Sequence, residues 1–190
     1  MPLNVAIGAI LVIAGIVAAV LLVTTFNTVV ALQRRADRAL GNVDVALKQR
    51  HDELPNVVSA VRGQLTFERT VLDEVTRARA SFSEDAPLSQ QAATSDRTTR
   101  ALRSLFATVE RYPDLHSREN VLALQAEIER LETLIAGRRE LFNQQVYQYN
   151  ATIQQLPAVL LAGLFGWRPR DLFQAPEPER LRPEVGIQPG

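Results

Sequence analysis

The sequence predicts an all-α protein: an N-terminal transmembrane helix followed by an antiparallel, up-down four-helix bundle. Three observations support this prediction. The run Val5–Val23 contains no charged or strongly polar side chain, and the first charge in the chain is Arg34. After this run, apolar residues recur at spacings of three and four, which is the period of an amphipathic helix. The remaining positions are rich in helix formers, and prolines mark the breaks between segments.

The apolar run has the length of a membrane span. As a helix, Val5–Val23 would be about 29 Å long, close to the hydrocarbon thickness of a bilayer. A secretory signal has a basic start, a shorter apolar core and a small-residue cleavage site after that core. Here the first four residues carry no Lys or Arg, and Ala18-Ala19 lie inside the run. We therefore expect an uncleaved anchor over residues 1–23, with residues 5–23 in contact with membrane lipid.

Basic residues flank the apolar run on one side only. Arg34, Arg35 and Arg38 follow it, and Asp37 is the single acidic residue among them. The positive-inside rule then places the N-terminus outside and the bulk of the chain in the cytoplasm.

The first two helices are separated by a proline in this prediction. The anchor is expected to continue into a soluble helix that reaches about His51. The recurring apolar positions of that helix are Ala36, Leu40, Val43 and Leu47. Pro55 lacks an N–H donor and restricts the residue before it, so His51–Leu54 is interpreted as a break between two helices. A kink in one long helix is the alternative. The next stripe runs from Val57 to about Phe82.

Two more helices follow a loop. Ser83–Thr94 has a proline, acidic residues and no apolar run, so a loop is expected there. The third helix ends at Tyr112, before a proline. The fourth helix is expected to begin after Ser117, a candidate N-cap, and its apolar residues from Val121 to Ile153 keep a 3–4 alternation over about 35 residues, which is typical of coiled-coil seams. Pro157 ends it.

A short apolar segment near the C-terminus permits two interpretations. Its length is insufficient to span a bilayer. Packing against the end of the bundle is favoured over contact of Phe165 and Trp167 with the bilayer interface, where aromatic rings are stabilised. The interfacial contact requires the chain to reverse direction at Pro55. Residues 174–190 are rich in proline and poor in apolar side chains, so a disordered tail is expected.

Four stretches of the chain resemble the LemA family of bacterial membrane-anchored helical proteins. They are NVDVALKQRHDELPNVVSAVRG (Asn42–Gly63), Ala78-Arg79-Ala80, VERYPDL (Val109–Leu115) with the downstream LQAEIERLETLIAGRRELFN, and VYQYNATIQQLP (Val146–Pro157) with the trailing FGW. The resemblance covers roughly Thr24 to Phe173. It implies a LemA-like helical bundle over residues 24–173, carried on one anchor in the bacterial inner membrane.

The resemblance also bears on activity and partners. No enzymatic activity or cofactor is established for the family. Some relatives act in the formation of organelle-like membranes, and others look tied to membrane metalloproteases of the heat-shock type. These roles are expectations from the family and are assigned to no residue here.

The composition argues against several classes of function. Lys+Arg and Asp+Glu both number 21, and no basic block exists to exchange for phosphate counterions, so nucleic-acid binding is not expected. Cys is absent, and His51 and His116 lie far apart in the sequence. No nucleophile, phosphate-loop or metal-ligand motif occurs. We therefore expect no catalytic, cofactor-binding or metal-binding residues.

Two groups of polar residues are each open to a binding-site interpretation and to a structural one. Asp44, Lys48, Asp52 and Asn56 lie four apart and could line a polar groove, but charge pairing along a helix is favoured. Asn143, Tyr149 and Asn150 are interpreted as residues whose hydrogen bonds satisfy backbone groups and fix register.

The leading hypothesis is a membrane-anchored interaction or scaffold protein that presents its cytoplasmic bundle to another membrane protein or to itself. The alternative is a membrane-remodelling or organelle-formation factor. It would act by lateral assembly and by interfacial contact of residues 156–173.

Overall fold

The described residues form six α-helices and no strand. The computed structural model describes residues 2–63, 65, 68–116 and 118–174. The helices are α1 (Pro2–Arg62), α2 (Arg69–Ala80), α3 (Leu88–Val109), α4 (Pro113–His116), α5 (Glu119–Ile153) and α6 (Ala158–Phe165). The predicted all-α class is confirmed over this part of the chain. The tail that was expected to be disordered, from residue 175 onward, and the candidate N-cap Ser117 lie outside the described residues.

Helix α1 is continuous from the apolar run to the far end of the domain. It contains 61 residues, which corresponds to about 92 Å. Pro55 lies inside it, so the break interpreted at His51–Leu54 is wrong, and the chain reverses only after Arg62. Proline costs one backbone hydrogen bond and some steric strain. Leu54, Val57 and Val61 are nevertheless fully buried, and their packing outweighs this local cost.

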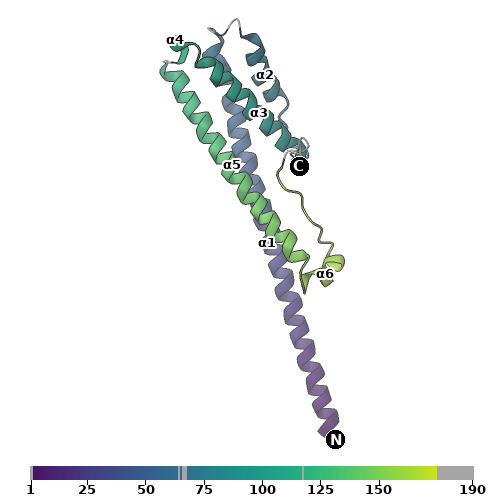
Figure 1. Ribbon diagram of the computed structural model, residues 1–190. Helices are drawn as coiled ribbons and strands as arrows, with labels where there is room; N and C mark the ends of the chain where they lie inside the picture. The colour runs from purple at the N-terminus through teal and green to yellow at the C-terminus, as the bar shows by residue number, and fades with distance from the viewer. Residues whose placement is uncertain (1, 64, 66–67, 117, 175–190) are drawn as a thin grey trace, which may run out of the picture.

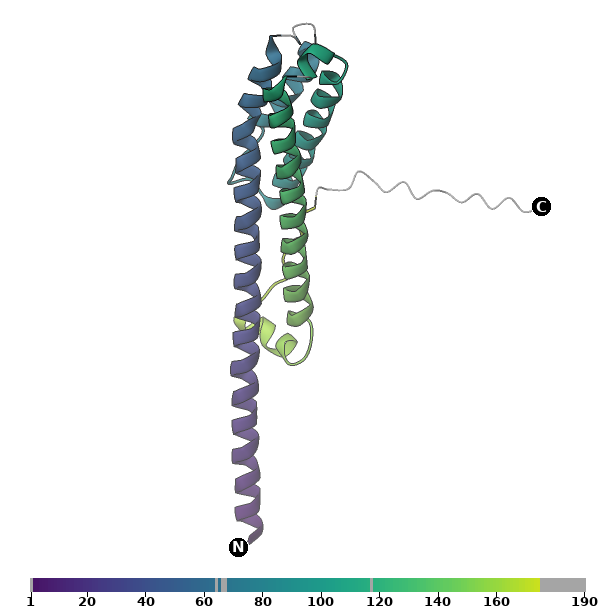
Figure 2. The same cartoon turned by 90° about the vertical axis from the view of Figure 1, so that its left-hand side faces the viewer.

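The helices run alternately away from and toward the N-terminal end of α1 (Figures 1 and 2). Helices α2 and α3 pack against each other at the far end, and α4 makes a short turn there. Helix α5 then returns along α1, in the most extensive helix–helix pairing of the structure. Its end brings α6 beside α1, next to the apolar run.

The core changes in composition along the molecule. Its far part is built from α1, α2, α3, α4 and α5 together, around Leu54, Leu105 and Leu115. Closer to the N-terminal end, α1 and α5 pack mainly on each other, with Phe173 from the segment after α6. Helix α2 has 12 residues and α5 has 35. These five helices thus share a core only at the far end, where α2, α3 and α4 pack on the α1–α5 pair.

Helix α3 begins inside the segment predicted as a loop. Pro87 precedes its first turn, and its carbonyl accepts hydrogen bonds from the amides of Gln90 and Gln91. The buried face of this turn consists of small residues such as Ala92 and Thr94. Because an apolar stripe is the main sequence signal for a helix, a face built from Ala, Ser and Thr escaped the prediction.

Candidate functional site

An apolar and aromatic surface lies where the domain meets the apolar run of α1. We call it the basal surface; it consists of Phe26, Leu156, Leu160, Leu164, Phe165 and Trp167. Three of its rings are in contact. The Phe26 and Phe165 centroids are 5.0 Å apart, and the Phe165 and Trp167 centroids are 5.2 Å apart. The Phe26 and Trp167 centroids lie 6.1 Å apart. The structure therefore brings both sequence-predicted interface residues, Phe165 and Trp167, onto one residue of α1.

The local backbone directs these rings toward α1. Ala158, the first residue of α6, is 2% exposed and packs with Val29 and Ile153. At the other end of α6, Gly166 adopts φ 67°, a left-handed conformation that ends the helix at little cost only for glycine. The Trp167 amide then bonds the Ala162 carbonyl at 2.9 Å. This turn reverses the chain at the end of α6. The Trp167 indole therefore lies against Phe165 of α6 and near Phe26 of α1.

Most of the basal surface is not covered by protein. Leu156 and Leu160 are each 74% exposed, and Leu164 is 76% exposed. Phe165 is 37% exposed, whereas Trp167 is half-buried against the cluster around Val29. The favoured interpretation, packing on the bundle end, thus describes Trp167 but not the three leucines. Contiguous exposed apolar groups of this kind mark interaction or membrane-contact surfaces.

The basal surface is continuous with the exposed apolar face of α1. All side chains from Ala6 to Thr24 are exposed. The most apolar window of α1 has a mean hydropathy of 3.0 and no buried residue, so by length and composition this helix could cross a membrane. Phe26 follows Val23 by one turn or less, about 5 Å along the axis. The aromatic contacts therefore lie immediately beyond the apolar run.

The segment after α6 is tied back to both long helices. The Asn150 side chain makes two hydrogen bonds of 2.9 Å with the backbone of Arg170. Its Nδ2 group donates to the Arg170 carbonyl, and its Oδ1 atom accepts from the Arg170 backbone N–H. The Arg170 guanidinium forms an ion pair with Asp37 at 2.6 Å. Further on, the Phe173 amide bonds the Asn143 side chain at 2.7 Å. The predicted backbone-satisfying role of Asn143 and Asn150 is therefore what the structure shows.

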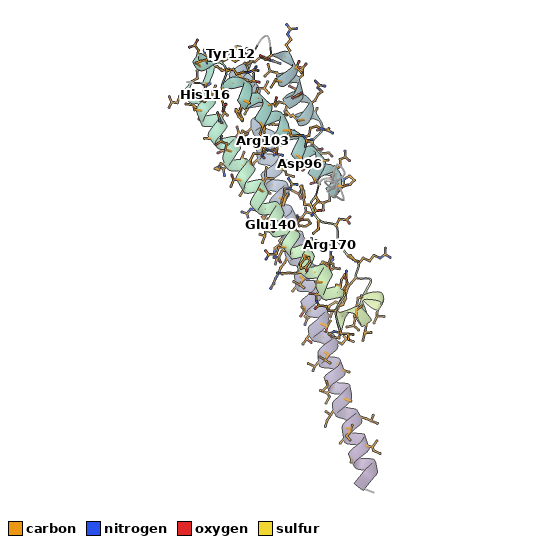
Figure 3. All side chains as sticks on the ribbon, viewed as in Figure 1. Asp96, Arg103, Tyr112, His116, Glu140 and Arg170 are labelled. Atoms are coloured by element: carbon orange, nitrogen blue, oxygen red, sulfur yellow. The ribbon has the colours of Figure 1, made fainter. Side chains whose placement is uncertain are left out.

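Helices α3 and α5 leave a polar groove between them at the far end. Two adjoining cavities of about 630 Å³ and 560 Å³ occupy it. Figure 3 shows Asp96 and Arg103 on the α3 side. Asp96 pairs with Arg139 of α5 at 2.7 Å and closes the lower end of the groove. The lining side chains of the two cavities include Thr99, Arg100, Phe106, Gln125, Glu129 and Glu132.

Arg50 of α1 lies beneath this groove and was missed by the sequence analysis. Its side chain is 3% exposed. The guanidinium donates to Glu132 at 2.6 Å, to the Thr99 hydroxyl at 2.9 Å and to the Ser95 hydroxyl at 2.9 Å. Arg50 thus connects α1, α3 and α5. A signal was present, because position 50 follows Leu47 by three and precedes Leu54 by four on the apolar stripe.

The four polar residues spaced along α1 do not form a groove. Lys48 pairs with Glu84 at 2.6 Å, and this hydrogen bond raises the pKa of Lys48. Asn56 instead donates to Glu53 at 2.9 Å. Burial raises the pKa of Asp44, with a smaller effect from the charge of Glu84. Lys48 therefore pairs with the segment between α2 and α3, and the favoured interpretation of charge pairing along the helix is wrong for this residue.

One comparison with known proteins bears on the helical domain from residue 39 onward. No curated protein matches the sequence. The model of the LemA family matches residues 39–186, which is most of the chain. The chain belongs to the LemA family. The match to LemA begins after the apolar run and includes the α3/α5 groove, Arg50, α6 and the segment after α6. Among the residues that the structure describes, this LemA protein has no group of three or more His, Asp or Glu side chains placed to hold a metal ion.

Proposed function

We propose that this LemA-family protein is a membrane-anchored scaffold. The apolar run of α1 spans the bacterial inner membrane, and the helical domain is presented to a membrane-protein partner or to a second copy. One observation carries the proposal: α1 continues without interruption from the run Val5–Val23 into the buried face that ends at Val61. No flexible linker separates anchor and domain, so the surface of the domain is held at a fixed height above the bilayer.

The groove between α3 and α5 is the surface that the scaffold would present. It lies at the far end of the domain, remote from the bilayer, and it is open to solvent. Arg100 and Arg103 line it, are exposed, and form no ion pair within the described part of the chain. A partner segment with carboxylates would complement these charges. A membrane metalloprotease is one class of partner that the family resemblance offers.

Crosslinking from the groove tests the scaffold. The chain contains no native Cys, so Arg103→Cys gives a single attachment point for a photocrosslinker in the full-length protein. Extraction in mild detergent should then yield a discrete crosslinked species. Asp73→Cys, on the exposed outer face of α2, is the matched control and should give little product. A protein that remains monomeric and without a partner from both positions contradicts the proposal.

The proposed orientation places the N-terminus outside and the domain in the cytoplasm. Arg34, Arg35 and Arg38 are all exposed and begin about 16 Å beyond the apolar run, within the distance over which the positive-inside rule applies, and this charge bias supports the orientation. Ser59→Cys, at an exposed position of α1, should be protected from a membrane-impermeant maleimide in intact cells and labelled after permeabilisation. Labelling in intact cells would contradict this orientation and place the domain outside the cytoplasm.

A second function is favoured by the exposed leucines of α6. Residues 156–173 could enter the bilayer interface and remodel the membrane when several copies assemble laterally. Full-length protein in vesicles should then deform them, as seen by electron microscopy, and Leu160→Ser/Leu164→Ser should abolish the deformation. Equal vesicle shapes with and without the protein would exclude remodelling and leave the scaffold unaffected.

A further inference from the structure

The part of the domain nearest the apolar run carries an excess of positive charge. It consists of residues 24–40 of α1 and residues 141–174, which lie at the same height because Val29 packs with Tyr149 and Ala36 with Val146. These two ranges contain five Arg and two Asp, a net charge of +3, although the whole chain has a net charge of zero. The charged residues are Arg34, Arg35, Asp37, Arg38, Arg168, Arg170 and Asp171.

Four of these arginines have no carboxylate partner among the described residues. Arg170 pairs with Asp37 and so removes the one acidic side chain close to the others on α1. Arg34, Arg35, Arg38 and Arg168 are exposed, and none takes part in an ion pair in the described structure. Farther from the apolar run, Arg50, Arg111, Arg130 and Arg139 each pair with a carboxylate, whereas Arg100 and Arg103 do not pair with one within the described residues. A shortage of nearby acidic residues is therefore what distinguishes the part of the domain nearest that run.

The unpaired arginines of α1 lie outside its buried face. Ala36 and Ala39 are buried against α5, at 0% and 5% exposure. At about 100° per residue, Arg34 and Arg38 fall about 170° and about 130° from the midpoint of Ala36 and Ala39, on the opposite side of the helix, whereas Arg35 falls about 70° from it, on the flank. They therefore form a cationic collar around the outer face and one flank of α1, and Arg168 adds a fourth charge next to Trp167.

The collar lies above the headgroup layer, which extends about 5–8 Å beyond the hydrocarbon core, so its arginines reach lipid phosphates through side chains that lean back toward the bilayer. Arg34 follows Val23 by about 16 Å along the helix, and helical side chains lean back toward the N-terminus, which brings the guanidinium groups closer to the bilayer. The turns of α1 between Val23 and Arg34 suit a layer with little water, because their threonine hydroxyls are hydrogen-bonded within the helix. The hydroxyls of Thr24 and Thr28 donate to the carbonyls of Val20 and Thr24, each at 2.8 Å. These polar groups are thus satisfied inside the helix.

We propose that the basal surface and the arginine collar together form a binding surface for anionic phospholipid headgroups. Leu156, Leu160 and Leu164 enter the interfacial layer, and the collar arginines bind lipid phosphates through paired N–H donors. This inference rests on the membrane insertion of α1 proposed above. It favours lipid over a second copy of the chain, because a symmetric contact through this surface would bring the unpaired arginines of both copies together.

Trp167 is the single tryptophan of the chain and reports on its own surroundings. The full-length protein is reconstituted in phosphatidylcholine vesicles with and without about 30% phosphatidylglycerol, a typical anionic fraction. Trp167 emission should be blue-shifted relative to tryptophan in water. Lipids brominated near the glycerol should quench this emission more than lipids brominated at the chain ends. Leu160→Ser/Leu164→Ser should lose most of this shallow quenching. Leu122→Ser, which changes an exposed leucine at the far end of the domain, should retain it.

The arginine collar is tested by the lipid that co-purifies in mild detergent. From mixed vesicles, the wild-type protein should retain phosphatidylglycerol severalfold over its bulk proportion, and salt should reduce this enrichment. Arg34→Gln/Arg35→Gln/Arg38→Gln should abolish it. The control, Arg62→Gln/Arg69→Gln/Arg77→Gln, removes three exposed arginines at the far end and should preserve it. Equal enrichment in both triple variants, or none in the wild type, overturns the proposal.

An alkaline carbonate wash separates failure of this proposal from failure of the anchor. Protein released from the vesicles would show that α1 does not span the bilayer. Protein that stays bound, with Trp167 fully quenched by aqueous acrylamide in both lipid mixtures, would leave the anchor standing and refute the lipid surface.

Discussion

At the scale of single residues, the domain depends on one buried cation. Arg50 is enclosed by α1, α3 and α5, and each of its partners belongs to a different turn of those helices. A buried ion pair adds little net stability compared with an apolar replacement of both members, but removing one member leaves the other charge unpaired. Arg50 therefore fixes how α3 and α5 sit on α1 more than it raises stability.

Replacement of Arg50 by alanine should expose this dependence. Arg50→Ala leaves the Glu132 carboxylate beside a cavity and should lower the free energy of unfolding by about 3 kcal/mol. Arg103→Ala, which changes an unpaired arginine of the same groove, should change it by less than about 0.5 kcal/mol. Urea titration followed by far-UV circular dichroism measures both. Similar losses in the two variants would contradict the role given to Arg50.

His51 should make stability depend on pH. Its ring stacks on Phe82 at 4.6 Å, and burial, aided by the charge of Arg79, lowers the pKa of His51 below its usual value. Below about pH 6.5 the unfolded chain therefore binds a proton that the folded chain takes up only at lower pH. The contribution of His51 is complete above that pH and is lost as the pH falls through the window between the two pKa values. Thermal unfolding from pH 7.5 to 5 should show a shallower slope in His51→Gln, and an unchanged slope would exclude His51 as its source.

At the scale of helices, α1 shows how packing outweighs a local signal. Pro55 disfavours a helix, yet the stripe that continues through Leu54 and Val57 is buried against α2 and α3. The chain turns instead after Arg62, about two helical turns beyond the proline. Local sequence identified a weak point in the helix but could not weigh it against contacts with residues far along the chain.

Pro55→Ala should therefore stabilise the protein. Alanine restores a donor to the helix interior and removes a steric clash, and a gain of about 1 kcal/mol or more is expected. Pro113→Ala is the matched control, because proline at the first position of α4 is already well placed and its loss should be neutral or unfavourable. Differential scanning calorimetry compares the two. A destabilised Pro55→Ala would indicate that the proline is needed for the path of α1.

The sequence predicted α5 better than it predicted α1 or the sites. The apolar stripe from Val121 to Ile153 that predicted the fourth helix lies entirely within α5, because its 3–4 spacing is kept over many turns. The start of α3 was missed because its buried face is made of small residues. The sequence did not predict the role of Arg50, and it predicted only Phe165 and Trp167 of the basal surface. Both depend on which helices meet in space, and a single sequence shows the period of a helix but not the helices that pack against it.

At the scale of the whole molecule, the unbroken α1 determines the reach of the domain. Ser59 follows Val23 by about 54 Å along the helix, and Thr28 follows it by about 8 Å. Because native Cys is absent, dyes attached at Ser59→Cys or Thr28→Cys give single-site distances to an acceptor in the bilayer. Energy transfer should be strong from Thr28→Cys and weak from Ser59→Cys. Comparable transfer from the two positions would show that the domain folds down onto the membrane.

As the membrane span proposed above, the same helix would act as a lever whose tilt depends on the thickness of the bilayer. A spanning helix tilts to match the hydrocarbon layer around it, and the tilt changes when that layer thins or thickens. For a straight arm of about 54 Å, a change of tilt by about 10° moves the far end sideways by about 9 Å. The α2–α3 hairpin at that end would then shift relative to any partner fixed in the membrane, so that lipid composition alone would alter which contacts the groove can make.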